Sequence, residues 1–233
     1  MAAATVCVAE PVTTDEDKVG PAQTVYAPDS GRGRVIIVIS GQSGPTSYKP
    51  YAAELAKIGY YVVLLDGKDI LNHSQWPDAK QLHKAIKRAT SSSQAEPGKV
   101  AVIGFSLGGG GALLHAAAMP NLVSMVVAYY PFTREWVDKI NWFTKRFSMP
   151  VLVLAAQRDR YKDCCVVETA HAMELAAKAN GAKFELVVYP NADHGFNLKT
   201  SAPGEPNRAY RADDDRDAWR RTTDMLRQYH PLR

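Results

Sequence analysis

Short runs of consecutive apolar residues alternate along the chain with segments in which apolar residues recur at helical spacing. The apolar runs predict six strands, over 34–40, 60–66, 99–105, 122–130, 150–156 and 183–189. Continuous apolar runs rich in Val, Ile and Leu are typical of parallel strands that are buried on both faces. A weaker additional strand is expected near 24–26.

The segments between these runs predict helices, over 50–58, 77–90, 107–118, 132–148, 166–179 and 217–229. Strands that alternate with helices predict an α/β fold, with a mainly parallel sheet covered by helices on both faces. The chain has no internal repeat and no low-complexity tract, so we expect a single domain over residues 21–233. Residues 1–20 are expected to form a loose N-terminal arm.

Charge and composition exclude several classes of partner. The 28 basic and 24 acidic residues are spread along the chain, and no dense basic run is available to bind a nucleic-acid backbone. The opening MAAATVCVAE lacks a basic region typical of a signal peptide, and no apolar run approaches the ~18 residues of a membrane span. We therefore expect a cytoplasmic protein without a membrane span, either a monomer or a homodimer.

The three cysteines are Cys7, Cys164 and Cys165, which are too few for a disulfide framework. The two adjacent cysteines also lack the spacing of a tetrahedral metal pair. We expect no metal site, a reducing compartment, and Cys164 and Cys165 as inert packing residues at the start of a helix.

The glycine-rich stretch GFSLGGGG, residues 104–111, follows a predicted strand and opens a predicted helix. A dinucleotide-binding turn requires glycine at the third position, which is Ser106 here, and a phosphate-binding loop requires Lys and Ser or Thr after the last glycine, where Ala112 and Leu113 stand. The stretch does contain the pattern G-x-S-x-G, which between a strand and a helix is typical of a nucleophilic serine held on a sharp turn. We therefore predict Ser106 as a nucleophile rather than part of a purely structural glycine turn.

A nucleophilic serine requires a base, usually histidine, and a carboxylate that orients the histidine. On a sheet of this kind the carboxylate and then the histidine follow the serine along the chain. His194 lies directly after the predicted strand 183–189, at the sheet edge where Ser106 emerges. The other five histidines are set aside by position, as helix, early-chain or tail residues: His73, His83, His115, His171 and His230.

Asp159 follows the predicted strand 150–156 and is the preferred carboxylate, with Asp163 as its competitor. The flanking Arg158 and Arg160 leave open that Asp159 only forms a salt bridge. A serine of this kind also needs backbone N–H donors for the oxyanion of the intermediate. We expect these from Leu107 and from the turn after the first strong strand, where Gln42 is preferred to Ser43.

These residues resemble the dienelactone hydrolase family of the α/β-hydrolase superfamily. The likeness rests on YAAELAKIGYYVVLLD, VAVIGFSLGGGGAL, AYYPF, VLVLAAQRD, YPNADHGF and a final helix with DAWRRT. It implies a small α/β-hydrolase fold with a minimal lid and a Ser106, Asp159 and His194 triad that needs no metal or cofactor.

Two departures from the family pattern affect the expected substrate. The family's namesakes use cysteine where this chain has Ser106, with a glutamate at the position that matches Gly41. They also place an arginine four residues after the histidine, where this chain has Leu198. The resemblance therefore implies a serine esterase rather than an enzyme for dienelactone itself.

We expect a hydrolase of small carboxylic esters or lactones. An acyltransferase, a thioesterase or a peptidase would use the same acyl-enzyme, and a catalytically silent binding protein is a further alternative. The segment 131–149 is too short for a large lid, which predicts an open pocket. Aromatic residues are expected to line it, principally Tyr130, Trp136 and Trp76, with Tyr129 and Trp142 as further candidates.

Overall fold

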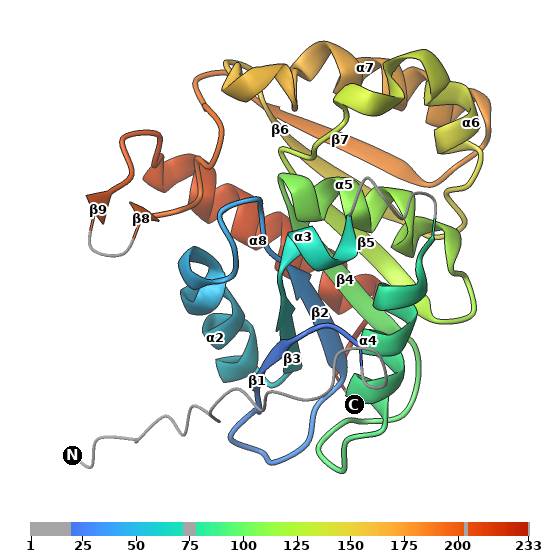
Figure 1. The fold of residues 1–233 in the computed structure, drawn as a ribbon, viewed down its shortest axis with the longest axis vertical. Coiled ribbons are helices and arrows are strands. Elements are labelled where there is room, and N and C mark those ends of the chain that lie inside the picture. The colour runs from blue at the N-terminus through green and yellow to red at the C-terminus, as the bar shows by residue number, and fades with distance from the viewer. Residues whose placement is uncertain (1–19, 72–77, 203–204, 233) are drawn as a thin grey trace.

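The computed structural model describes residues 20–71, 78–202 and 205–232 (Figure 1). Its centre is a seven-stranded sheet with the order β1-β3-β2-β4-β5-β6-β7. The strands are β1 (Gln23–Tyr26), β2 (Val35–Ile39), β3 (Tyr61–Leu65), β4 (Val100–Phe105), β5 (Val123–Tyr129), β6 (Val151–Ala156) and β7 (Phe184–Tyr189).

Every neighbouring pair in this sheet is parallel except β1 and β3, which run antiparallel with Gln23 opposite Leu65. The six predicted strands are therefore confirmed, and the weak early strand is present as the edge strand β1. Because β2 to β6 are covered on both faces, nearly all of their residues are buried, which is why they read as continuous apolar runs.

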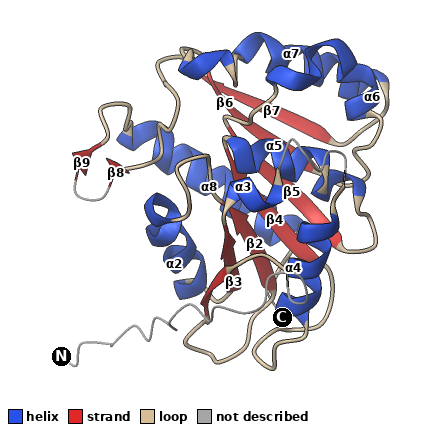
Figure 2. Ribbon diagram, viewed as in Figure 1, coloured by secondary structure: helices blue, strands red, loops and turns tan. Residues whose placement is uncertain are grey.

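Helices cover both faces of the sheet (Figure 2). The α-helices are α2 (Lys49–Lys57), α3 (Gly67–Ile70), α4 (Lys80–Thr90), α5 (Leu107–Leu114), α6 (Ile140–Thr144), α7 (Val167–Ala179) and α8 (Ala212–Tyr229), and the 3-10 helices are η1 (Thr46–Tyr48), η3 (Ala116–Ala118), η4 (Arg134–Lys139) and η5 (Tyr161–Asp163). One core cluster packs α4, α5, α6 and α7 against one face, and a second packs α2 and α8 against the other. The α/β-hydrolase architecture is thus confirmed.

The segment 132–148 differs from the single amphipathic helix that its sequence predicts. It contains η4 and then α6, because Lys139 at φ −125° and ψ 16° leaves the helical region between them. The apolar periodicity was nevertheless informative, since Trp136, Phe143 and Phe147 are all buried in the core. The apolar pattern over 132–148 therefore predicts the buried face correctly and the backbone conformation incorrectly.

Two further differences from the predicted elements lie after β7. Helix α8 begins at Ala212 rather than 217, with Asp213, Asp214 and Asp215 in its first turn. Negative charge there stabilises the helix, because the helix dipole is positive at its N-terminus. A two-stranded antiparallel ribbon of β8 (Thr200–Ala202) and β9 (Glu205–Pro206) was not predicted. Of the described helices, none has the length and apolarity required to span a membrane.

Candidate active site

Ser106 lies on a sharp turn between β4 and α5. Its backbone has φ 52° and ψ −116°, a left-handed conformation that non-glycine residues rarely adopt. Backbone hydrogen bonds hold it there: its N–H donates to Tyr129 O at 3.0 Å, and its carbonyl accepts from the N–H groups of Phe132 at 2.8 Å and Gly110 at 3.0 Å. The strained serine is fixed at the carboxyl end of the central strand.

The glycines that flank Ser106 allow the turn to close. A Cβ atom at Gly104 would lie 2.2 Å from Gly108 O, and one at Gly108 would lie 2.4 Å from the carbonyl oxygens of Ile39 and Ser40. Both distances are far below van der Waals contact with backbone atoms that cannot easily move. The two glycines of the G-x-S-x-G pattern are therefore steric requirements of this strand–turn–helix junction.

His194 reaches Ser106 from the loop after β7. Its Nε2 lies 3.0 Å from Ser106 Oγ, and its Nδ1 lies 2.7 Å from Asp159 Oδ2. The loop is anchored by Asn207, whose side-chain amide donates to the carbonyl oxygens of Gly195 and Leu198, both at 2.9 Å. These contacts hold the imidazole between the hydroxyl and the carboxylate.

Asp159 follows β6 and is fully buried. Its Oδ1 accepts the backbone N–H of Tyr161 at 3.0 Å, while Oδ2 faces His194. Both carboxylate oxygens are therefore hydrogen bonded, as a buried carboxylate requires. The competing Asp163 is exposed at the end of η5, so the structure brings Asp159 and not Asp163 to the histidine.

The flanking arginines do not form a salt bridge with the Asp159 carboxylate. Arg158 donates to Asn191 Oδ1 at 2.7 Å, and Arg160 pairs with Glu168 at 3.5 Å. Arg160 also reaches Asp159, but only its backbone carbonyl, at 3.4 Å. The carboxylate is left to the histidine and to the Tyr161 N–H.

Two of the histidines set aside by position are buried in the core. Burial lowers the pKa of His115 to about 4 and that of His230 to about 3. His230 was expected in a terminal tail, but it is fully buried, stacks on Tyr60 and lies 2.9 Å from Ser124 Oγ. Both lie away from Ser106, and His73 lies outside the described residues.

The two proposed N–H donors lie beside Ser106. Leu107 is the first residue of α5, and Gln42 belongs to the turn after β2; both line the same cavity as Ser106. Within the described part of the chain, neither N–H group donates to a protein acceptor. Both donors are therefore available to an oxygen atom bound in the cavity.

Gly41, which precedes Gln42, packs against Tyr48. A Cβ atom at position 41 would lie 2.5 Å from the Tyr48 hydroxyl oxygen and 3.3 Å from Ser106 Cβ. The phenol thus fills the space that a side chain at position 41 would need. Burial raises the pKa of Tyr48 to about 12, so its hydroxyl remains protonated at neutral pH.

A cavity of about 410 Å³ opens above Ser106. Its lining comes from the turn after β2, from α3 and the residue after it, from the β4–α5 turn, from the residues after β5, and from η5 and the residue after it: Gln42, Lys68, Leu71, Ser106, Leu107, Phe132, Arg134, Glu135, Tyr161, Lys162 and Cys164. Three cationic side chains and one carboxylate are among them. The cavity is therefore partly apolar and partly positively charged.

Four of the aromatic residues expected in this cavity are absent from its lining: Tyr129, Tyr130, Trp136 and Trp142. Trp136 is buried and stacks on Phe143, with ring centroids 4.8 Å apart, and Tyr130 is buried against the core side of His194. The prediction that Tyr130 and Trp136 line the cavity is wrong, because both rings fill core positions. Tyr129 is fully buried and Trp142 is exposed outside the cavity, while Trp76 lies outside the described residues.

Further contacts around the site were not predicted from the sequence. The ring of Tyr161 covers one side of His194, and the Tyr130 hydroxyl donates to Asn197 Oδ1 at 2.6 Å in the histidine loop. Cys164 and Cys165 are joined in a disulfide, and Cys164 lines the cavity, so the expectation of inert packing residues is corrected. No local sequence pattern marks these contacts, since they depend on how the loops fold back.

The strand–turn–helix junction, the sheet order and the spacing of the site agree with one group of known proteins. The sequence profile described as the Dienelactone hydrolase family matches residues 22–230. The chain belongs to the dienelactone hydrolase family. It is thus a member of a family of hydrolases that adopt this fold.

Individual relatives support the same membership. A carboxymethylenebutenolidase from Rhodococcus opacus is 29% identical over 227 residues, covering 86% of this chain and 83% of the relative. Among solved structures, a putative dienelactone hydrolase from Klebsiella pneumoniae superposes with a TM-score of 0.70 at 21% identity, covering 90% of this chain and 93% of that one. A dienelactone hydrolase-like promiscuous phosphotriesterase from metagenomic libraries gives 0.74 at 18% identity, covering 94% and 97%. At these identities, the two solved structures show that the fold is shared.

Proposed function

We propose that this member of the dienelactone hydrolase family is a serine hydrolase of small carboxylic esters or lactones. The observation that carries the proposal is the continuous hydrogen-bonded series from Ser106 Oγ through both imidazole nitrogens of His194 to Asp159, at 3.0 Å and 2.7 Å. A serine, a base and a buried carboxylate in this arrangement are the parts required for nucleophilic acyl transfer.

In the first half of the reaction, Ser106 Oγ attacks the ester carbonyl carbon, while His194 Nε2 removes the hydroxyl proton of Ser106. Asp159 accepts a hydrogen bond from Nδ1–H, which fixes the tautomer and stabilises the imidazolium. The N–H groups of Leu107 and Gln42 stabilise the oxyanion of the tetrahedral intermediate. His194 then returns the proton to the leaving alcohol, which leaves an acyl ester on Ser106.

In the second half, a water molecule replaces the alcohol. His194 removes a proton from the water as it attacks the acyl carbonyl, and the proton then passes to Ser106 Oγ as the acid leaves. With a lactone, alcohol and acid are parts of one product molecule. The same residues act in both halves, so one arrangement of hydrogen bonds suffices.

The cavity favours a small substrate that carries negative charge. Leu71 and Phe132 supply apolar contact, while Lys68, Arg134 and Lys162 supply positive charge against the single carboxylate of Glu135. The Rhodococcus opacus relative bears the name carboxymethylenebutenolidase, which refers to a butenolide, an unsaturated lactone. Leu198 stands where the family's arginine is expected, so any substrate carboxylate would be held by the cations of this cavity instead.

Labelling with a fluorophosphonate tests the nucleophile directly. The reagent phosphonylates an activated serine, and intact-protein mass spectrometry should find one adduct on the wild-type protein and none on Ser106→Ala. Ser91→Ala is the matched control, because Ser91 is an exposed serine at the C-terminal end of α4 and is not part of the cavity lining, so labelling should be unchanged. An adduct that persists in Ser106→Ala would disprove this nucleophile.

The rate of ester hydrolysis provides the second part of the test. The wild-type protein should hydrolyse chromogenic short-chain esters, and His194→Ala should reduce the rate by on the order of 10⁴-fold or more. Labelling without measurable hydrolysis of esters, lactones or thioesters would argue against a hydrolase and favour transfer of the acyl group to another acceptor.

A further inference from the structure

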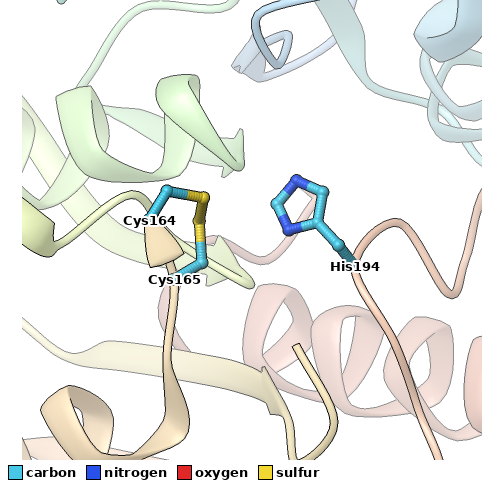
Figure 3. Close-up of side chains that lie close together, drawn as sticks. All are labelled: Cys164, Cys165 and His194. Carbon is cyan, nitrogen blue, oxygen red and sulfur yellow. A yellow bond between two sulfur atoms is a disulfide. The ribbon is translucent and has the colours of Figure 1, made fainter. Parts of the chain in front are cut away.

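The disulfide-bonded pair Cys164 and Cys165 lies beside His194. The pair follows η5, precedes α7 and is buried, with exposed fractions of 6% and 4%. Both sulfur atoms and a ring nitrogen of His194 lie within 4.8 Å of one another (Figure 3). Two soft donors therefore face the imidazole from the side of the cavity that Cys164 lines.

Backbone hydrogen bonds hold Cys164 in place independently of the bond between the two sulfur atoms. The carbonyl of Cys164 accepts the N–H groups of Thr133 at 2.8 Å and Arg134 at 3.1 Å, and its own N–H donates to Tyr161 O at 3.1 Å. Opening the disulfide removes none of these hydrogen bonds. The reduced Cys164 side chain would thus remain next to His194, with Cys165 adjacent to it in the chain.

Two thiolates and one imidazole form a donor set that soft and borderline cations prefer, zinc above all. Ligand atoms that share one zinc ion lie about 3 to 4 Å apart, given zinc–sulfur and zinc–nitrogen bonds of about 2.3 and 2.0 Å. The three donors here need only side-chain adjustment to reach such positions. The sequence alone did not predict this metal site, because the third ligand, His194, comes from a loop that follows another strand.

We propose that reduction of the Cys164–Cys165 disulfide creates a binding site for a thiophilic divalent cation such as Zn²⁺, completed by His194. Reduction by a phosphine consumes one water and yields two thiols and a phosphine oxide. Metal binding then releases both thiol protons, since the thiolate is the ligand. In the disulfide form the sulfur atoms carry no negative charge and the site is closed to the cation.

Occupation of this site stops the chemistry assigned to His194, a consequence that rests on the proposed hydrolase function. Coordination through Nε2 removes the lone pair that accepts the Ser106 proton, and coordination through Nδ1 displaces the Asp159 carboxylate. Either mode prevents proton transfer. The cation is therefore an inhibitor whose access depends on the oxidation state of the cysteine pair.

Cation binding is tested with a spectroscopic signal that does not require activity. The whole protein carrying Cys7→Ser, which leaves these two cysteines as the only ones, is reduced with a phosphine, desalted under argon and titrated with Cd²⁺. A thiolate-to-cadmium charge-transfer band should grow to one equivalent. The unreduced protein and the Cys164→Ser, Cys165→Ser variant should show no band, and His194→Ala should bind with on the order of 100-fold lower affinity.

Hydrolysis of a chromogenic ester is then measured with Zn²⁺, each sample being compared with its own zinc-free rate. Zinc should inhibit the reduced protein by at least about tenfold at saturation and leave the oxidised protein and the double serine variant within about twofold. Equal inhibition of all three, or a cadmium band unaffected by His194→Ala, would overturn the proposal. A protein that binds cadmium as described but hydrolyses no ester would instead refute the proposed function and leave the metal site standing.

Discussion

The phenol ring of Tyr161 stacks on the imidazole of His194, with ring centroids 4.6 Å apart and ring planes 15° from parallel. The backbone N–H of the same residue donates to Asp159 Oδ1. Tyr161 thus contacts two of the three residues on which the proposed mechanism depends, although the residue is 43% exposed.

Replacement of Tyr161 should therefore impair turnover more than stability. Tyr161→Leu removes the ring and keeps the backbone N–H, and an aromatic contact of about 0.5 to 1.5 kcal/mol predicts a two- to tenfold lower kcat. Tyr161→Phe keeps the ring and should retain the wild-type rate. Steady-state kinetics across pH with a short-chain ester measures both, and equal losses in the two variants would show that the hydroxyl, not the stacking, matters.

The choice between two carboxylates gives the second prediction. Asp159→Asn should lower kcat by on the order of 10³- to 10⁴-fold, because the amide no longer favours the required histidine tautomer. Asp163→Asn, a change of the same chemical size four residues away at an exposed position, should remain within about twofold. If Asp163→Asn proved inactive and Asp159→Asn normal, the orienting role would belong to Asp163.

A steric contact gives the third prediction. Gly41→Ala places a methyl group 2.5 Å from the Tyr48 hydroxyl oxygen, so we expect a loss of about 1 to 3 kcal/mol in the free energy of unfolding and a lower rate of ester hydrolysis. Adding Tyr48→Phe removes that oxygen and leaves the ring carbon at an ordinary 3.5 Å. Urea unfolding of both single variants and the double variant gives the coupling free energy, and simple additivity would contradict the contact.

Acid pH should destabilise the protein through its buried histidines. Burial lowers the pKa of His115 to about 4 and of His230 to about 3, so between these values and about 6.5 the unfolded chain binds more protons than the folded one. Stability from these neutral imidazoles is present above pH 6.5 and is lost as pH falls toward 4.

Each histidine should contribute roughly 1 to 2 kcal/mol to the difference in unfolding free energy between pH 7 and pH 5. Urea titrations at the two pH values measure this difference. His115→Leu should reduce the difference, whereas His171→Gln, at an exposed position, should leave it unchanged. An unaltered difference in His115→Leu would mean that this histidine is not held neutral in the folded protein.

The sheet and the relation among Ser106, Asp159 and His194 could be anticipated because they follow from strand ends. Parallel strands bring their carboxyl ends to one edge, so residues directly after β4, β6 and β7 had to approach one another. Contacts that depend on loop conformation were not accessible in this way. Tyr130 and Lys162 have φ values of 34° and 51°, which local propensity does not predict.

The absence of Tyr130 and Trp136 from the cavity lining has a related physical reason. Helical periodicity marks Trp136 as apolar and inward-facing, but it does not distinguish a core from a cavity wall. In the structure the ring meets Phe132 and Phe143 and lies close to Gly110. Cation-bearing loops, rather than aromatic helix faces, supply much of the cavity surface.

The order of the strands also bears on how the protein is made. Ser106 emerges from β4 near the middle of the chain, whereas Asp159 and His194 follow β6 and β7. The later helix α8 also contacts the sheet, because Thr222 forms a hydrogen bond of 2.8 Å with the hydroxyl of Tyr129 at the end of β5. A polypeptide still being synthesised therefore carries its serine long before the base that would activate it. Newly made chains should be unreactive toward esters until almost the whole sequence has left the ribosome.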